Sequence, residues 1–329
     1  MSISADHSPR LKFILAFASV YVIWGSTYLA IRFAVETLPP FLMAGVRFLV
    51  AGVALFLFMR SRTSERLTTQ HWKTAFILGG LLLLGGNGLV SWAEKYVSSG
   101  LAATLVATSP LWIFFMEWLF LGAKLTVKNG AGIVFGMIGL LLLLNPFDEA
   151  GNADFIGSMT IVLAALLWAA GSIYSKRAPL PKSSFLSGAI QMICGGVLLI
   201  IVGLVVGETD QFSWSNVSEE SLWALLYLIV FGSVVALSAF YWLLQNTSAS
   251  KATTYAFVNP AVAVFLGWLL ADEQVSASSF VALGLIVLAV ILVLSSKPKM
   301  REPVSKAKTK PQDEDFSLPK PEDSPCASS

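Results

Sequence analysis

The sequence predicts an all-α integral membrane protein with ten transmembrane helices arranged as two inverted five-helix repeats. Three observations predict this fold class. Of the 329 residues, 56% are hydrophobic and only 13% are charged, whereas a soluble domain carries about a quarter charged residues. The apolar residues fall into ten segments of membrane-spanning length, and one half of the chain repeats the other. Long apolar runs indicate helices, because the strands of a membrane β-barrel alternate polar and apolar residues.

A shift of 150 residues maps the first half of the chain onto the second. It places Trp92 on Trp242 and Pro110 on Pro260, all within apolar sequence. The same shift aligns six further pairs: Ser98 with Ser248, Ala102 with Ala252, Thr104 with Thr254, Phe115 with Phe265, Trp118 with Trp268, and Leu119 with Leu269. Repetition within membrane-length segments is typical of two-repeat transporters, in which the substrate site lies where the repeats meet.

The ten expected spans are separated by polar or proline-containing breaks. In the first repeat we expect spans at residues 11–31, 41–60, 73–92, 97–122 and 128–145. In the second repeat we expect them at 155–175, 184–206, 221–244, 251–271 and 277–296. The first segment follows Arg10 and Lys12, as a signal peptide would, but no convincing cleavage site follows it. We therefore interpret it as a retained helix.

The basic residues lie almost entirely on one side of the predicted membrane. With the N-terminus in the cytoplasm, all 22 Lys and Arg residues except Arg32, Arg47 and Lys95 fall in cytoplasmic regions. The opposite side is acidic: Asp148, Glu149, Asp154, Glu208, Asp210, Glu219, Glu220, Asp272 and Glu273. This asymmetry predicts ten spans with both termini in the cytoplasm. Five spans per repeat is an odd number, so the second repeat must enter the membrane from the opposite side.

These boundaries predict five regions. A cytoplasmic N-terminal tail covers 1–10, the repeats cover 11–145 and 155–296, and a periplasmic linker at 146–154 joins them. Residues 297–329 are rich in Lys, Pro, Ser, Asp and Glu, with Phe316 as their single aromatic residue. Such a composition cannot bury a core, so we expect a disordered cytoplasmic tail.

Aromatic residues deep within the spans are candidates for lining a substrate site. Trp24 and Tyr28 share a face of the first span, as Trp168 and Ser172 do in the sixth. Trp112 and Tyr241 complete the set of candidates. Tryptophans near span ends usually anchor at the membrane interface, and this interpretation suits Trp92, Trp118, Trp223, Trp242 and Trp268. An aromatic cavity would suit amphipathic organic substrates.

The prolines and amides within the spans add a second group of candidates. Pro110 and Pro260 each remove a backbone donor, which lipid tolerates only where neighbours or a wet cavity compensate. Each is either a kink facing a cavity or a packed kink without a role in transport. Asn259 precedes Pro260, Tyr255 lies one turn earlier, and the repeat shift maps Asn259 onto Ser109. Asn87 lies among glycines in the third span, and its amide either binds substrate or ties two helices together.

Two charges are expected inside the membrane. Arg47 lies about two turns into the second span and Glu117 about one turn from the end of the fourth. An intramembrane charge indicates function by default, although both residues are close enough to an interface to reach it. Both histidines, His7 and His71, lie outside the spans, so no proton relay is evident.

Several short pieces form a set by their order and spacing over residues 13–296: Trp24-Gly25-Ser26-Thr27, Ser109-Pro110-Leu111, Gly171-Ser172-Ile173-Tyr174, Tyr255-Ala256-Phe257-Val258-Asn259-Pro260 and Asp272-Glu273. This set resembles the EamA-type proteins of the drug/metabolite transporter superfamily, in particular the bacterial inner-membrane exporters. The resemblance implies ten helices in two inverted repeats around a central cavity. It also implies export of amino acids, related metabolites or drugs, without nucleotide hydrolysis.

The chain departs from the family pattern at two places. The family often ends its fourth and ninth helices with a Leu-Gly-Glu-type element. The second copy keeps the acid as Glu273, whereas the first reads Leu121-Gly122-Ala123-Lys124. Relatives can also carry an acid where this chain has Gln191. These departures weaken the expectation that this chain shares a charge-based coupling mechanism with the family.

The sequence thus predicts a secondary transporter that exports small amphipathic solutes across a bacterial cytoplasmic membrane by alternating access. We expect a small-molecule substrate and the lipid bilayer as partners, and no nucleic acid; a homodimer is left open. No cofactor or metal is expected, because neither Cys194 nor Cys326 belongs to a CxxC or Cys/His cluster. An importer and a channel or lipid-translocating protein remain alternatives. A membrane enzyme is disfavoured, because no clustered acids or nucleophile–base pair are evident.

Overall fold

The computed structural model describes residues 8–121, 126–144, 152–210, 212–246, 255–273 and 277–295. Within these ranges every regular element is a helix. The C-terminal tail predicted at 297–329, and most of the tail and linker predicted at 1–10 and 146–154, lie outside the described residues. The all-α prediction is therefore confirmed for the described part of the chain.

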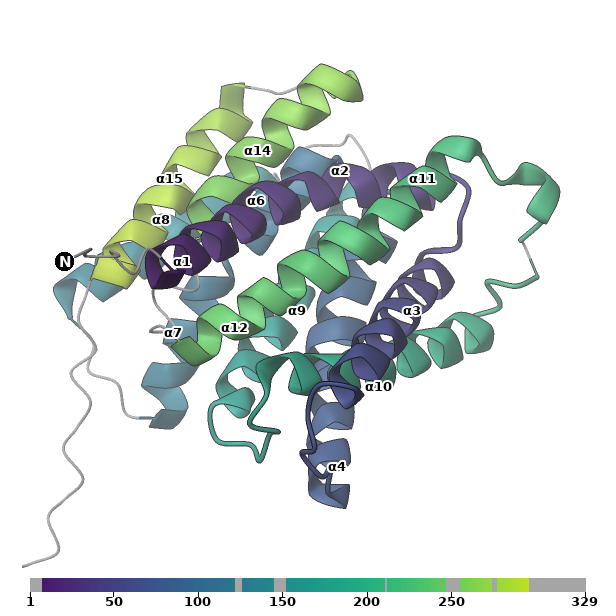
Figure 1. Ribbon diagram of the computed structural model, residues 1–329. Helices are drawn as coiled ribbons and strands as arrows, with labels where there is room; N and C mark the ends of the chain where they lie inside the picture. The colour runs from purple at the N-terminus through teal and green to yellow at the C-terminus, as the bar shows by residue number, and fades with distance from the viewer. Residues whose placement is uncertain are drawn as a thin grey trace, which may run out of the picture.

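Helices follow one another throughout the first repeat (Figure 1). They are α1 (Ser8–Ala18), η1 (Ser19–Ile23), α2 (Trp24–Val35), α3 (Pro40–Arg60), α4 (Thr69–Leu78), η2 (Gly79–Gly88), α5 (Leu89–Ala93), α6 (Ser99–Val106), α7 (Ser109–Leu121) and α8 (Val127–Leu144). The elements η1 and η2 are π-helical turns within longer helices. Such turns are frequent at functional sites.

The second repeat has a similar succession. It comprises α9 (Asn152–Ser175), α10 (Ser184–Val205), the short 3₁₀ helix η3 (Trp214–Asn216), α11 (Glu219–Tyr227), the π-helical η4 (Leu228–Leu237), α12 (Ser238–Asn246), α14 (Tyr255–Leu270) and α15 (Ala277–Ser295). The two longest π-helical segments are η2, in the third predicted span, and η4, in the eighth. The shift that maps Trp92 onto Trp242 also brings η2 onto η4. The repeat is therefore present in the helix geometry as well as in the sequence.

Among the described residues, seven helical segments are long and apolar enough to cross a membrane. They are Leu11–Val35, Pro40–Arg60, Thr69–Ala93, Ser99–Leu119, Phe155–Ser175, Ser184–Val205 and Glu219–Leu243. The remaining three predicted spans correspond to shorter apolar helices at Gly130–Gly139, Val258–Leu270 and Phe280–Ala289. The chain is thus a multi-pass membrane protein by its helix lengths and composition.

Local sequence signals explain where several of these helices begin. Pro40 occupies the first turn of α3, where its missing N–H is not needed. The side chains of Ser98, Ser183 and Ser218 cap α6, α10 and α11 by accepting a backbone N–H. Each cap satisfies one of the donors that a helix start leaves unpaired.

The two repeats are joined through pairs of equivalent helices. Helix α3 packs along α10 and α8 packs along α15, and these are the most extensive helix contacts of the described residues (Figure 1). Carboxylates reinforce the α3–α10 pair at both ends. Glu208, which follows α10, accepts the backbone N–H groups of Phe41 and Leu42 at the start of α3, at 3.1 and 2.9 Å. Glu65, which follows α3, accepts those of Lys182 and Ser183 before α10, at 2.7 and 3.2 Å.

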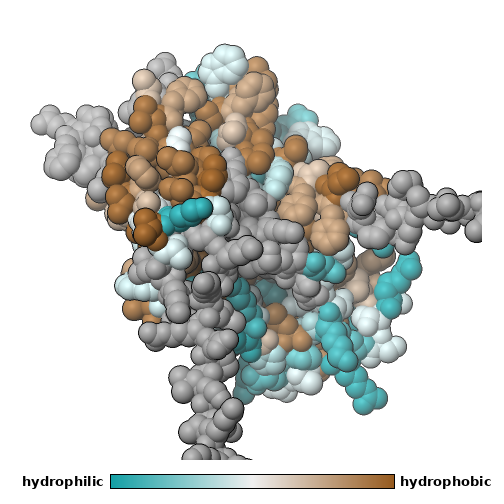
Figure 2. Space-filling view, turned by 90° about the vertical axis from the view of Figure 1, so that its left-hand side faces the viewer, coloured by the Kyte–Doolittle hydropathy of each residue, from teal (hydrophilic) through white to brown (hydrophobic). Residues whose placement is uncertain are grey.

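The outer surface of the bundle is strongly apolar. Figure 2 shows hydrophobic side chains over the upper part of one face and hydrophilic side chains toward its lower part. Large apolar residues exposed on α14 and α15 include Phe265, Trp268, Phe280 and Val281. A surface of this kind is suited to contact with lipid chains.

Candidate substrate cavity

A cavity of about 60 Å³ lies between the two repeats. The first repeat contributes α2, α3, η2, α5 and α6 to its wall, and the second contributes α9 and α14. The lining residues are Trp24, Thr27, Tyr28, Ile31, Arg47, Gly86, Asn87, Val90, Val106, Ala164, Ala165, Trp168 and Tyr255. The cavity therefore depends on how the two repeats are docked.

Three aromatic residues from different spans meet in this wall. The Trp24 ring lies 6.0 Å from that of Trp168 and 5.3 Å from that of Tyr255, at interplanar angles of 80° and 89°. The Trp168 side chain also hydrogen-bonds with that of Tyr255. Edge-to-face pairs of this kind are favourable beyond the area they bury. They hold a rigid, mostly apolar wall with few polar atoms.

Glycines in the π-helical segments make room for this wall. A Cβ at Gly86 in η2 would lie 2.9 Å from Cε3 of Trp168, so only glycine lets the indole sit at this depth. In η4, the backbone carbonyl of Gly232 accepts a hydrogen bond from Nε1 of Trp24 at 3.3 Å. The π-helical turns thus position two of the three aromatic residues.

Arg47 brings a positive charge to the cavity. It is 2% exposed and lies on α3. Its Nε donates to Oγ of Ser233 at 2.9 Å, and its guanidinium carbon lies 4.7 Å from the centre of the Phe48 ring. Its Nη1 has no hydrogen-bond partner. A buried donor without an acceptor is costly, so this nitrogen is free to bind an incoming group.

Glu94 lies next to the cavity and is fully buried. It directly follows the span Thr69–Ala93, and neither of its carboxylate oxygens has a hydrogen-bond partner. Burial raises the pKa of the Glu94 carboxyl well above its usual range, the carboxylate of Glu273 raises it further, and the guanidinium groups of Arg32 and Arg47 lower it. A buried carboxyl group thus lies within electrostatic reach of the buried guanidinium of Arg47.

Beyond Glu94 lies a second hollow of about 260 Å³, lined by residues that include Arg32, Lys95 and Glu273. Nη1 of Arg32 donates to the backbone carbonyl of Glu94 at 2.6 Å. Glu273, after α14, accepts from the backbone N–H and the hydroxyl of Ser99 at 2.8 and 3.0 Å, and from the N–H of Gly100 at 3.2 Å. These bonds join the second repeat to the start of α6.

Of the residues predicted to bind substrate, the structure brings Trp24, Tyr28, Asn87, Trp168 and Tyr255 into the lining. Nδ2 of Asn87 donates to the carbonyl of Leu82 at 3.3 Å, so the amide is tied to its own helix on one side. Five further predicted residues lie outside the lining that the described residues define: Ser109, Trp112, Ser172, Tyr241 and Asn259.

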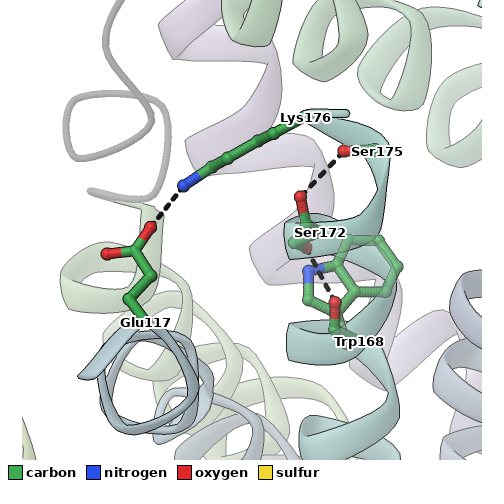
Figure 3. Close-up of polar contacts among 5 residues, drawn as sticks. All are labelled: Glu117, Trp168, Ser172, Ser175 and Lys176. Carbon is green, nitrogen blue, oxygen red and sulfur yellow. Dashed lines mark hydrogen bonds and ion pairs between the residues drawn. The ribbon is translucent and has the colours of Figure 1, made fainter. Parts of the chain in front are cut away.

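Local hydrogen bonds account for three of these five residues. Oγ of Ser109 donates to the carbonyl of Val106 at 2.6 Å, the carbonyl that Pro110 cannot bond because it lacks an N–H. Nε1 of Trp112 donates to the Thr108 hydroxyl at 3.1 Å. Oγ of Ser172 donates to the carbonyl of Trp168 at 2.7 Å (Figure 3).

The other two residues are buried but incompletely satisfied. Tyr241 packs against Gly188 of α10, where an added Cβ would lie 2.6 Å from the ring, and its hydroxyl has no partner. Asn259 is 3% exposed and its Oδ1 also has no partner. Of the predicted kinks, Pro110 is the second residue of α7, after a turn at 107–108, and Pro260 lies inside α14.

Glu117 lies away from the cavity. Its carboxylate pairs with the ammonium of Lys176, which reaches across from the end of α9 to α7 (Figure 3). Both side chains are partly exposed. Arg47 is thus the predicted intramembrane charge that faces the cavity, and Glu117 belongs to a peripheral ion pair.

Sequence reasoning missed Glu94, Gly232 and Ser233. Glu94 adjoins Lys95 at the end of a span, where a charge ordinarily belongs to a loop. Gly232 and Ser233 are small residues in an apolar segment, and nothing distinguishes them from helix-packing contacts. The signal that could have found Glu94 is the pair of cations, Arg32 and Arg47, in the two preceding spans, because buried charges are paired.

A multi-pass helical protein whose two repeats enclose an aromatic, charge-bearing cavity has the architecture of a membrane transporter. The chain matches the EamA-like transporter family over residues 11–145 and 155–295. It therefore belongs to this family, as its sequence motifs had indicated, and this membership points to a transporter rather than an enzyme.

Similar proteins agree with this class. The chain is 41% identical over 283 residues to the uncharacterized inner membrane transporter YedA of Escherichia coli strain K12, covering 86% of this chain and 90% of that one. It is 27% identical over 270 residues to the uncharacterized transporter YoaV of Bacillus subtilis, covering 81% and 91%. A solved crystal structure superposes with a TM-score of 0.61 at 18% identity, covering 87% of this chain and 98% of that one. That last similarity supports the fold alone.

Proposed function

We propose that this protein is a secondary transporter that exports small amphipathic metabolites across the cytoplasmic membrane by alternating access. The observation that carries the proposal is the cavity, whose wall is built from both repeats. A site shared between repeats changes its access when one repeat rocks against the other. The aromatic wall formed by Trp24, Trp168 and Tyr255 suits an apolar body, and Arg47 and Asn87 supply a few orienting polar groups.

The proposed topology has ten spans and both termini in the cytoplasm. The seven long apolar helices supply seven spans, and α8, α14 and α15 supply the other three. The repeats are assigned to 11–145 and 155–296. Support comes from the extensive packing of α3 on α10 and of α8 on α15, which are equivalent spans of the two repeats, and from the related π-helical segments η2 and η4. The direction of export is supported by the resemblance to inner-membrane exporters.

The proposal is tested by reconstituting the purified chain in liposomes and measuring counterflow with a panel of amino acids, nucleosides and aromatic cations. A carrier shows saturable uptake of labelled solute that is driven by unlabelled solute inside. Flux that does not saturate indicates a channel instead. Flux measured with an imposed gradient in each direction then distinguishes an exporter from an importer of the same solute.

A matched pair of tryptophan variants assigns the flux to the cavity. Trp24→Ala should lower the apparent affinity in counterflow about ten-fold or more, because it removes the ring surface on which the substrate is proposed to pack, and burying an apolar group of this size is worth about 1.5–3 kcal/mol. Trp268→Ala is the control, because this side chain is 60% exposed on the outside of α14. Equal counterflow by both variants would show that substrate does not use this cavity.

A further inference from the structure

The guanidinium of Arg47 at the end of the cavity has a hydrogen-bond donor that no protein acceptor uses. Arg47 is 2% exposed and lines the cavity. Ser233 occupies its Nε, Phe48 lies beside its guanidinium carbon, and no acceptor bonds its Nη1. A guanidinium offers its donors in a planar fork that matches a carboxylate. The site is therefore complementary to an anionic group with two oxygens in one plane.

Glu94 is the negative counterpart of Arg47, yet the two groups do not form a direct ion pair among the described residues. Both Glu94 oxygens are unpartnered. The titratable or charged groups around it are Tyr28 and Arg32 on α2, Arg47 on α3, Glu273 after α14, and Lys95 beside it. Helix α9, which also packs on α5, has no titratable residue from Phe155 to Ile173.

The charge balance of this site constrains what can bind. At a pH above the raised pKa of the Glu94 carboxyl, Arg47 is cationic and Glu94 is anionic, so the pair is neutral. An incoming carboxylate that takes Arg47 as its partner leaves Glu94 as a buried, unpaired charge. Such a charge is costly enough that the group is neutralised instead. Transfer of one proton from solution to Glu94 restores neutrality, and the proton then lies on a carboxylate oxygen that has no other partner.

We infer that Arg47 binds the carboxylate of an organic substrate and that Glu94 takes up one proton when it binds. The inference rests on the proposed function and names the substrate class and the coupling for the same cavity. The apolar body of the substrate packs on the aromatic wall of Trp24, Trp168 and Tyr255. Carboxylate and proton then cross together, so that the loaded site carries no net charge.

The binding test compares carboxylates with their amides, which have nearly the same shape and no charge. The probes are labelled 3-phenylpropionate, indole-3-acetate and L-phenylalanine, each competed by its own acid and amide on the purified full chain. Wild-type protein should prefer at least one acid over its amide by about 10-fold or more, the size of a charge-assisted hydrogen-bond pair. Arg47→Gln should abolish this preference, whereas Arg66→Gln, an exposed arginine, should preserve it.

Proton uptake is measured separately by adding the preferred acid to weakly buffered protein from about pH 6 to about pH 9. Wild-type protein should take up close to one proton per acid bound at some pH in this range. Its affinity should then rise by about ten-fold for each unit that the pH falls. Glu94→Gln should still bind the acid but without proton uptake or pH dependence. The control is Glu36→Gln, because Glu36 is exposed beside the second hollow.

A charge-balanced variant covers the possibility that a single substitution unfolds the protein. Arg47→Gln combined with Glu94→Gln leaves no unpaired buried charge, so it should remain monodisperse. It should bind acid and amide equally and take up no proton.

Four results would overturn the inference. The first is that no acid is preferred over its amide, and the second is that the acid preference survives in Arg47→Gln. The third is that proton uptake survives in Glu94→Gln. The fourth is that Glu94→Gln loses L-phenylalanine binding, which would assign Glu94 to the substrate ammonium. Counterflow of neutral or cationic solutes without any carboxylate binding would refute this inference but would still support the carrier function.

Discussion

Gly232 is the position where the smallest substitution should disturb the charged wall of the cavity. A Cβ at this residue would lie 3.0 Å from Nη2 of Arg47 and 3.1 Å from Cγ2 of Thr27. Unstrained contacts of this type are about 3.5–4.0 Å long, so Gly232→Ala must push the guanidinium away by about half an ångström. The backbone of η4 cannot absorb the change, because the Gly232 carbonyl is bonded to Nε1 of Trp24.

The energetic cost follows from the bond that the guanidinium makes on its other edge. Nε of Arg47 lies 2.9 Å from Oγ of Ser233, and a shift of about half an ångström takes this pair beyond the usual limit of about 3.2 Å. A buried donor left unsatisfied costs about 1–3 kcal/mol. Replacing glycine by alanine in a helix returns about 0.5–1 kcal/mol. We therefore expect a net loss of about 0–2.5 kcal/mol in stability, and a loss of about 5- to 150-fold in affinity for any ligand that uses Arg47.

Gly80→Ala is the matched control, because Gly80 lies in the repeat-related π-helical segment η2 and its Cβ would meet only Cδ1 of Leu198, at 3.7 Å. Thermal unfolding in detergent and the apparent affinity in counterflow are measured for both variants. Gly80→Ala should match or slightly exceed the wild-type stability and retain its affinity. If Gly232→Ala behaves in the same way, the argument that Gly232 and Ser233 position Arg47 is wrong.

Three further substitutions follow from the carboxylates outside the cavity. Glu117→Gln should change stability by less than about 1 kcal/mol and leave counterflow unchanged, because its ion pair is partly exposed. Glu208→Gln should lower the unfolding temperature by weakening two bonds to α3, at a cost of about 1–2 kcal/mol, whereas the exposed Glu220→Gln should not. Glu273→Gln should speed maleimide labelling of a cysteine placed in the cavity lining, because three bonds to α6 are weakened. Its control is Asp272→Asn, because asparagine retains the left-handed backbone at φ 49°. Equal labelling of the two variants would show that the bonds of Glu273 to α6 do not limit access to the cavity.

The depth of a residue along a span could be predicted from the sequence, whereas the direction of its side chain could not. Trp24 and Trp168 were selected because they lie deep in their spans and Tyr255 because it lies one turn before Asn259, and the structure brings all three into one wall. Trp112 is also deep in its span, yet it lies outside the lining. A helix that is apolar all round has no polar stripe to mark its inward face, so rotation about the axis is decided by packing alone.

The polar candidates Ser109 and Ser172 lie outside the lining for a related reason. Serine in a span is as able to bond its own backbone as to bind a ligand. Ser109 and Ser172 both donate to carbonyls within their own helical segments. The order Ser109-Pro110 indicates a local role for the serine, because its hydroxyl bonds the carbonyl of Val106 that the proline leaves free.

Glu94 required the tertiary structure. Its burial results from α2, α3 and the segment after α14 closing over the end of α5, and these elements lie far apart in the chain. A charge beside Lys95 at the end of a span carries no local sign of that burial. The electrostatic influence of Glu273 on Glu94 is a property of the docked repeats, and that of Arg32 and Arg47 is a property of the helix packing within the first repeat. Periodicity and composition contain neither.

The repeats share their architecture but not their charges, and this difference bears on how the transporter distinguishes its two ends. Both copies keep a carboxylate cap between α3 and α10, from Glu208 and from Glu65. The shift of 150 residues that relates the copies maps Glu94 onto Leu244 and Glu273 onto Ala123. Inverted repeats exchange conformations when access alternates, so symmetric contacts contribute equally to both states. Glu94 and Glu273 have no acidic residue at the repeat-related positions, so under the proposed alternating access their contacts would make the energies of the two states unequal.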